Sequence, residues 1–404
     1  MLVGLDDTDS PGGMCTTYIG VVLARRLQKN HFPVREARLL RLNPNVIYKT
    51  RGNAAICLDV TGEQTDVFRI ACEVVEEYAC FDHENTNPGV VVVESSPPSQ
   101  FYWHAVKGFC TVDEAIRVLE PAGALYTGYK NGRGLIGATA AVCSEFPDRT
   151  YEYLTYRKPE VFGTPRYVGR DSLFSAERAT YPHTWDTVDM VNDVVVCVPH
   201  TPDPVLFGIR GESPSWVAMA RRMVSSEPTE FEQIFITNQG TDAHLLEGRT
   251  GRLTEGFSYR LCGAVASFAK TGKGGHVDIT VTSNGAGIRC MAYEPTKGFR
   301  DIIRALWPGD EVEVTGSYKK GSINIEKIRI CGLTEAIVRK PPLCNACGKR
   351  MTSAGKEKGY KCRHCGGRAR EPEVTCIERD LQTGWYEVPP VARRHLAKPL
   401  CREA

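Results

Sequence analysis

The segment Gly309-Asp310-Glu311-Val312-Glu313-Val314-Thr315-Gly316 alternates polar and apolar residues between two glycines, a pattern typical of a half-buried β-strand. Similar segments surround it, so strands are predicted at residues 260–266, 276–282, 287–293, 310–318 and 322–330, with a helix at 297–306. Five strands with one helix between the third and the fourth is the order of an OB-fold. A different small β-barrel without a nucleic-acid role remains the alternative.

Two pairs of cysteines follow the predicted barrel, arranged as Cys344-x-x-Cys347, then 14 residues, then Cys362-x-x-Cys365. Each pair can present two thiolates to one tetrahedral Zn²⁺, and the spacing suits a two-stranded zinc ribbon. Because protein then fills all four metal positions, the site is expected to be structural. His364, inside the second pair, is expected to be a surface residue and not a ligand.

Charge is distributed unevenly along the chain. From Arg339 to the C-terminus there are 15 lysines and arginines against 7 aspartates and glutamates, a local balance of +8 in a chain of net charge +2. This indicates a polyanionic partner, although a solvated tail without a partner is the alternative. The predicted barrel also mixes aromatic rings with cations, as single-stranded nucleic acid favours. The predicted RNA contacts are Tyr293, Lys297, Arg300, Lys319 and Lys320 in the barrel, and Arg393, Arg394 and Lys398 in the tail.

The composition excludes several classes of protein. With 404 residues, 42% hydrophobic and 24% charged, the chain is expected to fold into two to four ordered domains. No apolar run approaches the roughly 18 residues that a membrane span needs. Aspartates stand at positions 6, 7 and 9, where a signal peptide needs an apolar core. We therefore expect a cytoplasmic protein whose cysteines are reduced.

Carboxylates gather where the first predicted strand, residues 1–5, ends. Asp6, Asp7 and Asp9 precede a glycine-containing turn at 10–13 and a helix predicted from Thr16 to Asn30. Carboxylates that face a helix N-terminus across a glycine loop are suited to Mg²⁺ and phosphate. The alternative is structural: Asp9 forms an Asx turn and Thr16 caps the helix. The loop is not a Walker A motif.

Cations occur in two turns of the same region. Lys49 and Arg51 lie in the segment Tyr48-Lys-Thr-Arg-Gly-Asn53, and Arg133 lies between two glycines. Such residues can bind a triphosphate, although basic turns are also common on protein surfaces. With the three aspartates, they favour nucleotide chemistry; the expected ATP contacts are Gly12, Gly13, Asn53 and Arg133.

A second α+β region is predicted from residue 135 to 246. Its clearest strands are 193–198 and 233–237, with a helix at 215–225 between them. Polar turns containing Glu212 and Asp242 lie near predicted strands, and such turns often line ligand pockets. Ordinary connecting loops are the alternative.

Together these pieces resemble the archaeal tRNA-isoleucine agmatinylcytidine synthetases, the TiaS family. The resemblance covers nearly the whole chain in the family's order. It rests on residues 4–10, 13–18, 41–44, 48–53, 85–89, 132–137, 204–212 and 237–242, on the predicted OB segment, on both cysteine pairs and on Gly384-Trp-Tyr-Glu-Val-Pro-Pro390.

The resemblance implies an α+β multidomain fold. The expected parts are an ATP-binding kinase-like α/β domain at 1–127, a ferredoxin-like domain at 128–250, an OB-fold at 256–335, a zinc ribbon at 339–370 and a basic tail at 371–404. It also implies an enzyme that uses ATP to phosphorylate the wobble cytidine of an isoleucine tRNA with a CAU anticodon. Agmatine is then attached at ring position 2, so that AUA is read as isoleucine.

Roles for residues follow from that resemblance. Asp6, Asp7 and Asp9 would bind Mg²⁺ and ATP, Lys49 and Arg51 would stabilise the transferred phosphoryl group, and Thr16 matches a threonine that the family phosphorylates. The acidic groups for the dication agmatine do not come from the resemblance. We choose Glu212 and Asp242, because they follow the best-defined strands of the second region, with Asp186 and Asp189 as alternatives. Two other classes remain open: another ATP-dependent RNA-modifying ligase, or a nucleic-acid-binding protein without enzymatic activity.

Overall fold

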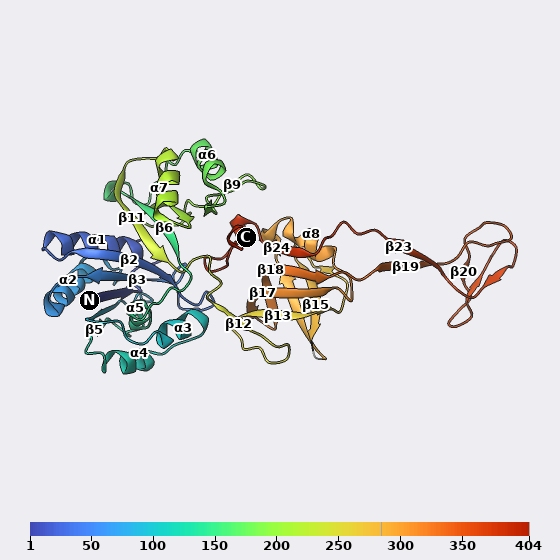
Figure 1. Cartoon of the computed structure of the whole chain (residues 1–404), viewed down its shortest axis with the longest axis horizontal. Helices are drawn as coiled ribbons and strands as arrows, with labels where there is room; N and C mark the ends of the chain where they lie inside the picture. The colour runs from blue at the N-terminus through green and yellow to red at the C-terminus, as the bar shows by residue number, and fades with distance from the viewer. Residues whose placement is uncertain (284, 404) are drawn as a thin grey trace.

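The computed structural model describes residues 1–283 and 285–403. Figure 1 shows three parts in a row: a sheet with its helices, a barrel, and a small ribbon at the end of a thin two-stranded stalk. No helix among the described residues is long and apolar enough to cross a membrane.

One nine-stranded sheet runs through the first 240 residues, in the order β5-β4-β1-β3-β2-β11-β6-β10-β7. All its pairings are antiparallel except β2–β11, where Ile236 and Thr237 lie opposite Arg38 and Leu39. That parallel pair joins the two regions that the sequence indicated into one sheet. The strands are β1 (Leu2–Asp6), β2 (Val34–Arg41), β3 (Ala54–Val60), β4 (Gly89–Val93), β5 (Leu125–Gly128), β6 (Thr150–Arg157), β7 (Thr184–Trp185), β10 (Val205–Gly211) and β11 (Thr229–Thr237).

Helices cover both faces of this sheet, because its central strands are apolar on both sides. In β4, Val90 and Val92 pack on the core beneath one pair of helices, and Val91 and Val93 pack on the opposite core. The first pair is α1 (Thr16–Lys29) and α2 (Gln64–Tyr78); the opposite face carries α3 (Gln100–Lys107), α4 (Val112–Leu119) and α5 (Gly134–Val142).

The second half of the sheet is covered by α6 (Arg170–Thr180) and α7 (Pro214–Met223), with η1 (Pro159–Val161) and a hairpin of β8 (Val188–Asp189) and β9 (Val194–Val195). A strand was predicted at 193–198, but the structure has only the two-residue strand β9 there. The residues that follow Val195 leave the hairpin, and several of them line a cavity.

The helix α5 lies very close to β1 and β4, and glycines make this possible. A Cβ on Gly134 would lie 2.3 Å from the backbone nitrogen of Gly89, and one on Gly137 would lie 1.8 Å from Oδ2 of Asp6. Side chains at these positions would push the helix away from the strand. The N-terminal turn of α5 is thereby held beside the carboxylates that follow β1.

The predicted five-stranded barrel is confirmed. It consists of β13 (Ser258–Val265), β15 (Val277–Ser283), β16 (Ala286–Ala292), β17 (Glu311–Lys319) and β18 (Ser322–Gly332), and it closes because β13 also pairs with β15. The helix α8 (Phe299–Arg304), preceded by η2 (Glu294–Thr296), lies between the third and fourth of these strands. The short strands β12 (Leu245–Glu247) and β14 (Lys270–Thr271) extend the sheet at its edges.

The ribbon differs from the two-stranded form expected from the cysteine spacing. Three short strands, β20 (Thr352–Ser353), β21 (Tyr360–Lys361) and β22 (Arg368–Ala369), form it, and β19 (Ala336–Lys340) pairs with β23 (Glu373–Ile377) as its stalk.

The chain after the stalk is not a free tail. β24 (Gly384–Glu387) pairs with β18 of the barrel, and η3 (Pro390–Ala392) and η4 (Leu400–Arg402) follow it. We call residues 388–403 the C-terminal segment; it lies against the sheet and the barrel, as Figure 1 shows.

Candidate active site

A cavity of about 490 Å³ lies where the two halves of the sheet meet the C-terminal segment. We call it the junction cavity. Its wall includes the end of β1, the loop before β3, parts of β6 and β10, and His395. Charged side chains of both signs line it: Asp6, Asp7, Asp9, Glu152 and Asp203, and Arg41, Lys49, Arg51, Arg133 and Arg210.

Two of the three N-terminal carboxylates are paired with the arginines that the sequence singled out. An Arg133 Nη2 lies 3.2 Å from Oδ2 of Asp7. Arg51 forms an ion pair with Asp9 and also donates to the carbonyl oxygen of Ser10, at 3.2 Å. Residues distant in the sequence are thus brought together as predicted.

Asp6 differs from its neighbours because it forms no ion pair among the described residues. Burial, and then the charge of Asp7, raises the pKa of Asp6 well above its ordinary value. Burial also raises the pKa of Asp7 and of Asp9, although Arg133 and Arg51 oppose the shift. A cluster of carboxylates whose charged forms are disfavoured is what a bound divalent cation would stabilise.

Thr16 lies in the wall of the cavity, but it is not the cap of its helix. It is the first residue of α1, the N-cap position belongs to Cys15, and no side chain caps that helix end. The buried Thr16 hydroxyl instead accepts a hydrogen bond of 3.0 Å from the hydroxyl of Thr8. The capping alternative for Thr16 is therefore wrong.

The residues that were predicted to contact ATP divide into two groups. Asn53 and Arg133 line the cavity, whereas Gly12 and Gly13 do not. These glycines lie in a turn that two backbone hydrogen bonds between Ser10 and Gly13 close; Gly12 is exposed and Gly13 is half-buried. Lys49 lines the cavity, donates to the carbonyl oxygen of Pro44, and has its pKa lowered by burial and by nearby Arg394 and Lys319.

The sequence did not reveal the far wall of the cavity. Glu152 of β6, whose side chain is 4% exposed, lies 3.3 Å from Nε of Arg210 and 3.7 Å from Nη2 of Arg41. The His395 ring accepts from Arg210 at 2.7 Å, and burial followed by the charge of Arg41 lowers the pKa of His395 well below its ordinary value. In the sequence, Glu152 lies in a strand that also contains Thr150, Thr155 and Arg157, so its charge did not single it out.

The predicted agmatine residues lie outside the cavity lining and already have partners. Glu212 pairs with Arg402, and Oδ2 of Asp242 lies 2.6 Å from Nζ of Lys327. Of the alternatives, Asp186 pairs with Arg393 and Arg210, and Asp189 accepts from Asn192. These carboxylates connect parts of the protein, and the structure does not bring them to the junction cavity.

The predicted phosphate contacts of the tail are also engaged within the protein. The Arg393 side chain is 5% exposed between Asp186 and Glu387, Arg394 lies 3.6 Å from Glu326, and Lys398 lies 3.6 Å from Asp148. Residues 371–404 also hold 5 lysines and arginines against 6 aspartates and glutamates, so this segment is not basic. The positive excess lies instead in residues 339–370, which contain 10 lysines and arginines and one glutamate. All ten of these cationic side chains are exposed.

The predicted contacts on the barrel lie at its surface with one exception. Lys297, Lys319 and Lys320 are exposed, and Tyr293 is 37% exposed. Arg300 is half-buried, because it donates to the carbonyl oxygen of Gly275 at 2.7 Å. Lys319 is the one that approaches the junction cavity, through Lys49.

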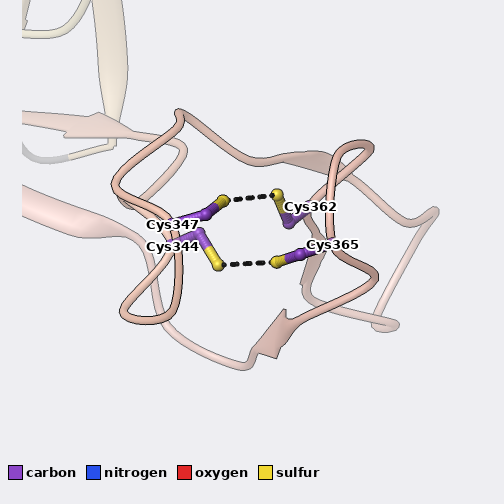
Figure 2. A group of neighbouring side chains, drawn as sticks. All are labelled: Cys344, Cys347, Cys362 and Cys365. Carbon is purple, nitrogen blue, oxygen red and sulfur yellow. Dashed lines mark hydrogen bonds between the residues drawn. The ribbon is translucent and has the colours of Figure 1, made fainter.

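The four cysteines of the ribbon meet as predicted (Figure 2). Sulfur atoms of Cys344 and Cys365 are 3.4 Å apart, and those of Cys347 and Cys362 are 3.5 Å apart. A tetrahedral zinc with bonds of about 2.3 Å needs sulfurs roughly 3.8 Å apart, so the set fits the metal. Backbone N–H groups, that of Cys365 foremost, lower the pKa of Cys362 to about 6, which favours the thiolate that zinc requires.

Comparison with known proteins gives a consistent result along the chain. Family models match for the TiaS TCKD domain over residues 2–67 and 59–131, the TiaS FLD domain over 132–244, and the TiaS C-terminal zinc ribbon domain over 341–381.

Whole proteins match as well. The isoleucine-tRNA 2-agmatinylcytidine synthetase TiaS of Methanocorpusculum labreanum is 56% identical over 403 residues, covering 100% of this chain and 97% of the relative. A solved complex of TiaS with isoleucine tRNA and ATP is 45% identical with a TM-score of 0.93, covering 99% of this chain and 97% of the other. A complex of TiaS with the same tRNA, AMPCPP and agmatine is 43% identical with a TM-score of 0.91, covering 99% and 96%. The chain described here therefore belongs to the TiaS family of isoleucine-tRNA 2-agmatinylcytidine synthetases.

Proposed function

We propose that this protein uses ATP to join agmatine to a cytidine of an isoleucine tRNA, and that the target is the wobble cytidine of its CAU anticodon. Membership of the TiaS family supports the overall reaction, because relatives carry that name and were solved with ATP, isoleucine tRNA and agmatine. The single observation on this chain that carries the proposal is the junction cavity, where Asp6, Asp7 and Asp9 face Arg51 and Arg133. The modified base would pair with adenine, so that AUA is read as isoleucine.

The chemistry explains why ATP is needed. The carbonyl carbon at ring position 2 of cytosine is a poor electrophile, and phosphorylation of its oxygen makes that oxygen part of a leaving group. The primary amine of agmatine then forms the new carbon–nitrogen bond, the carbon–oxygen bond breaks, and phosphate departs with the oxygen. The amine proton must pass to a base, for which the carboxylates of the cavity are suited.

Mg²⁺ fits the carboxylate cluster. Asp6, Asp7 and Asp9 would hold the ion, since it prefers oxygen ligands and since Asp6 is buried without an ion pair among the described residues. When bound, Mg²⁺ neutralises charge on the phosphates. In this protein Arg51 and Arg133 bind the carboxylates and are positioned to exchange them for phosphate oxygens, and Lys49 lies in the same wall.

Agmatine requires acidic groups that are accessible from the cavity. Because Glu212 and Asp242 lie outside the cavity lining, we assign its guanidinium to Asp203, which lines the cavity and lies close enough to Asp9 to raise the pKa of that residue. Oδ1 of Asp203 lies 3.5 Å from Nη2 of Arg166, so agmatine would compete with that arginine for the carboxylate. A planar guanidinium binds a carboxylate in a bidentate manner. Asp203→Asn is expected to raise the KM for agmatine more than the KM for ATP.

The remaining assignments complete the proposal. Residues 1–127 form a kinase-like catalytic domain and 128–250 a ferredoxin-like domain, and the barrel at 256–335 and the ribbon at 339–370 bind tRNA. Thr16 is a phosphorylation site within the cavity, and the enzyme works in the cytoplasm. The exposed cations of residues 339–370 support a role in holding the RNA backbone.

The direct test is mass analysis of the anticodon after incubation of purified protein with the CAU-anticodon isoleucine tRNA, ATP and agmatine. We expect a mass increase corresponding to agmatine minus water, confined to the wobble cytidine and dependent on ATP. An unchanged anticodon would reject the enzymatic function. Transfer of a different amine in preference to agmatine would identify another RNA-modifying ligase.

A further inference from the structure

We propose that Tyr48, at the mouth of the junction cavity, stacks on the base of a nucleotide adjacent to the wobble cytidine. The inference rests on the proposed function, because it assumes that a tRNA cytidine enters the cavity. It assigns a role to the exposed ring of Tyr48, which the catalytic proposal leaves unused.

The loop concerned, residues 43–53, is fixed at its base and exposed at its tip. The Asn43 side-chain amide donates to the carbonyl oxygens of Gly108 and Gly256, at 2.9 and 3.2 Å. Asn45 donates to the Ser258 hydroxyl at 3.3 Å, which connects the loop to the first barrel strand. By contrast, Ile47 is 72% exposed and Tyr48 is 62% exposed. The tip of this braced loop therefore presents an aromatic ring to solvent.

The ring of Tyr48 belongs to the cavity and is oriented by one of its arginines. Tyr48 lines the cavity, and the guanidinium carbon of Arg133 lies 5.1 Å from its ring centroid. Arg133 is the same residue that pairs with Asp7, so the ring stands directly beside the carboxylate cluster. Tyr48 is 62% exposed, so ring surface remains available for stacking although Arg133 lies over the ring.

The surroundings of the ring are positively charged. Lys49, Lys319 and Arg394 come from three separate segments, and the latter two lie close enough to lower the pKa of Lys49. Neither Lys49 nor Lys319 has a carboxylate partner within residues 1–283 and 285–403. Aromatic rings beside unneutralised cations are what single-stranded nucleic acid binds, through base stacking and phosphate contacts.

Covalent connectivity decides which part of the RNA meets the ring. A cytidine whose base reaches the carboxylates must leave the anticodon stack, while its two neighbours remain attached through short phosphodiester links. Those neighbours therefore lie across the mouth of the cavity, where Tyr48 replaces the stacking that they lost.

The test compares Tyr48→Ala with Tyr48→Phe, and uses Tyr167→Ala as a matched control. Tyr167 is also 62% exposed, but it does not line the cavity. Agmatine transfer is measured with the normal isoleucine tRNA and with two tRNAs that lack the base before, or the base after, the wobble cytidine. We expect Tyr48→Ala to lower kcat/KM for normal tRNA roughly five- to a hundredfold, and the two other variants to change it by less than about twofold.

The abasic substrates separate stacking from a structural effect. The penalty of Tyr48→Ala should fall to about twofold or less with one of them, because that base is the partner that has been removed. A penalty that persists with both, an effect on the KM for ATP instead, or no penalty at all would overturn the inference. Failure of the unaltered protein to modify any tRNA would instead refute the proposed function.

Discussion

The junction cavity and the zinc ribbon hold their functional groups in opposite ways. The four cysteines of the ribbon lie within 22 residues of one another, on a stalk that leads away from the rest of the protein (Figure 1). The cavity collects side chains from position 6 to position 395, through pairs such as Arg133–Asp7 and Arg210–Glu152. This contrast fits the division of labour that we propose, with the chemistry at the junction cavity and the ribbon holding the RNA backbone.

Loss of a zinc ligand is expected to have the largest effect, because it unfolds the ribbon. Cys344→Ser removes one of four ligands, and structural zinc contributes roughly 10–16 kcal/mol to the folding of such units. Zinc content should fall from about one per chain to near zero, and tRNA binding should weaken with a flatter salt dependence, while ATP binding is kept.

A matched control for the ribbon is Cys331→Ser, since Cys331 is an exposed free thiol outside the metal cluster. Metal analysis and filter binding at several salt concentrations provide the measurement. An unchanged salt dependence in Cys344→Ser would show that the ribbon does not bind the RNA backbone.

Breaking the contact between the C-terminal segment and the sheet is expected to have the next largest effect. Arg393 and Asp186 have side chains 5% and 3% exposed, so Arg393→Met leaves a buried carboxylate with one fewer partner. Such losses cost about 3–5 kcal/mol of unfolding free energy.

The surface pair Arg26–Glu77, 31% and 50% exposed, is the control, and Arg26→Ala should cost only about 0–1 kcal/mol. Urea denaturation measures both variants. Equal small losses would mean that the C-terminal segment is not an integral part of the fold.

Removal of one charge from the carboxylate cluster should stop the reaction and leave the fold intact. Asp7→Asn and Arg51→Ala each remove a group that we propose acts in the phosphoryl transfer. Losses of this kind are typically a hundredfold or more in rate, roughly 3 kcal/mol. Initial rates of agmatine transfer check this, with circular dichroism and tRNA binding as controls that should not change.

The smallest expected effect is a gain in stability. Burial and Asp7 raise the pKa of Asp6 in the folded protein, so the folded state holds this proton more tightly than the unfolded chain does. Protonated Asp6 therefore stabilises the folded state at a pH below the pKa of Asp6 in the unfolded chain, about 3.9. This stabilisation is lost as the pH rises through the higher pKa that Asp6 has in the folded protein.

Without Mg²⁺ at pH 7, Asp6→Asn should therefore be more stable than the unaltered protein by about 0.5–2 kcal/mol, although it is inactive. The difference should shrink at pH 4. Denaturation at both pH values tests this, and a variant that is less stable at pH 7 would contradict the account of the cluster.

The sequence predicted the features that are encoded locally, and it missed the side chains that only the tertiary fold brings together. The barrel was predictable because alternation along each strand reports which face is buried, and the ribbon because cysteine spacing fixes a zinc site locally. Asp6, Asp7, Arg51 and Arg133 were identified because they lie in turns beside predicted elements. Glu152, Arg210 and His395 were not, because only the β2–β11 pairing and the C-terminal segment bring them to the cavity.

The errors have a physical reason as well. Charge alone could not separate Arg393, which is buried between two carboxylates, from the exposed cations of residues 339–370. Glu212 and Asp242 resembled ligand residues because they follow or lie near strands, but Arg402 and Lys327 neutralise them across interfaces that the sequence does not display.

The measurement that tests the central claim most directly is the single-turnover rate of agmatine transfer, with each enzyme in saturating excess over the isoleucine tRNA. Under these conditions weakened tRNA binding no longer limits the rate, so the chemical step is compared alone. We predict that Cys344→Ser retains this rate within about tenfold, whereas Asp7→Asn loses a hundredfold or more. The opposite order, with the ribbon variant inactive and the cavity variant active, would contradict the assignment of chemistry to the junction cavity.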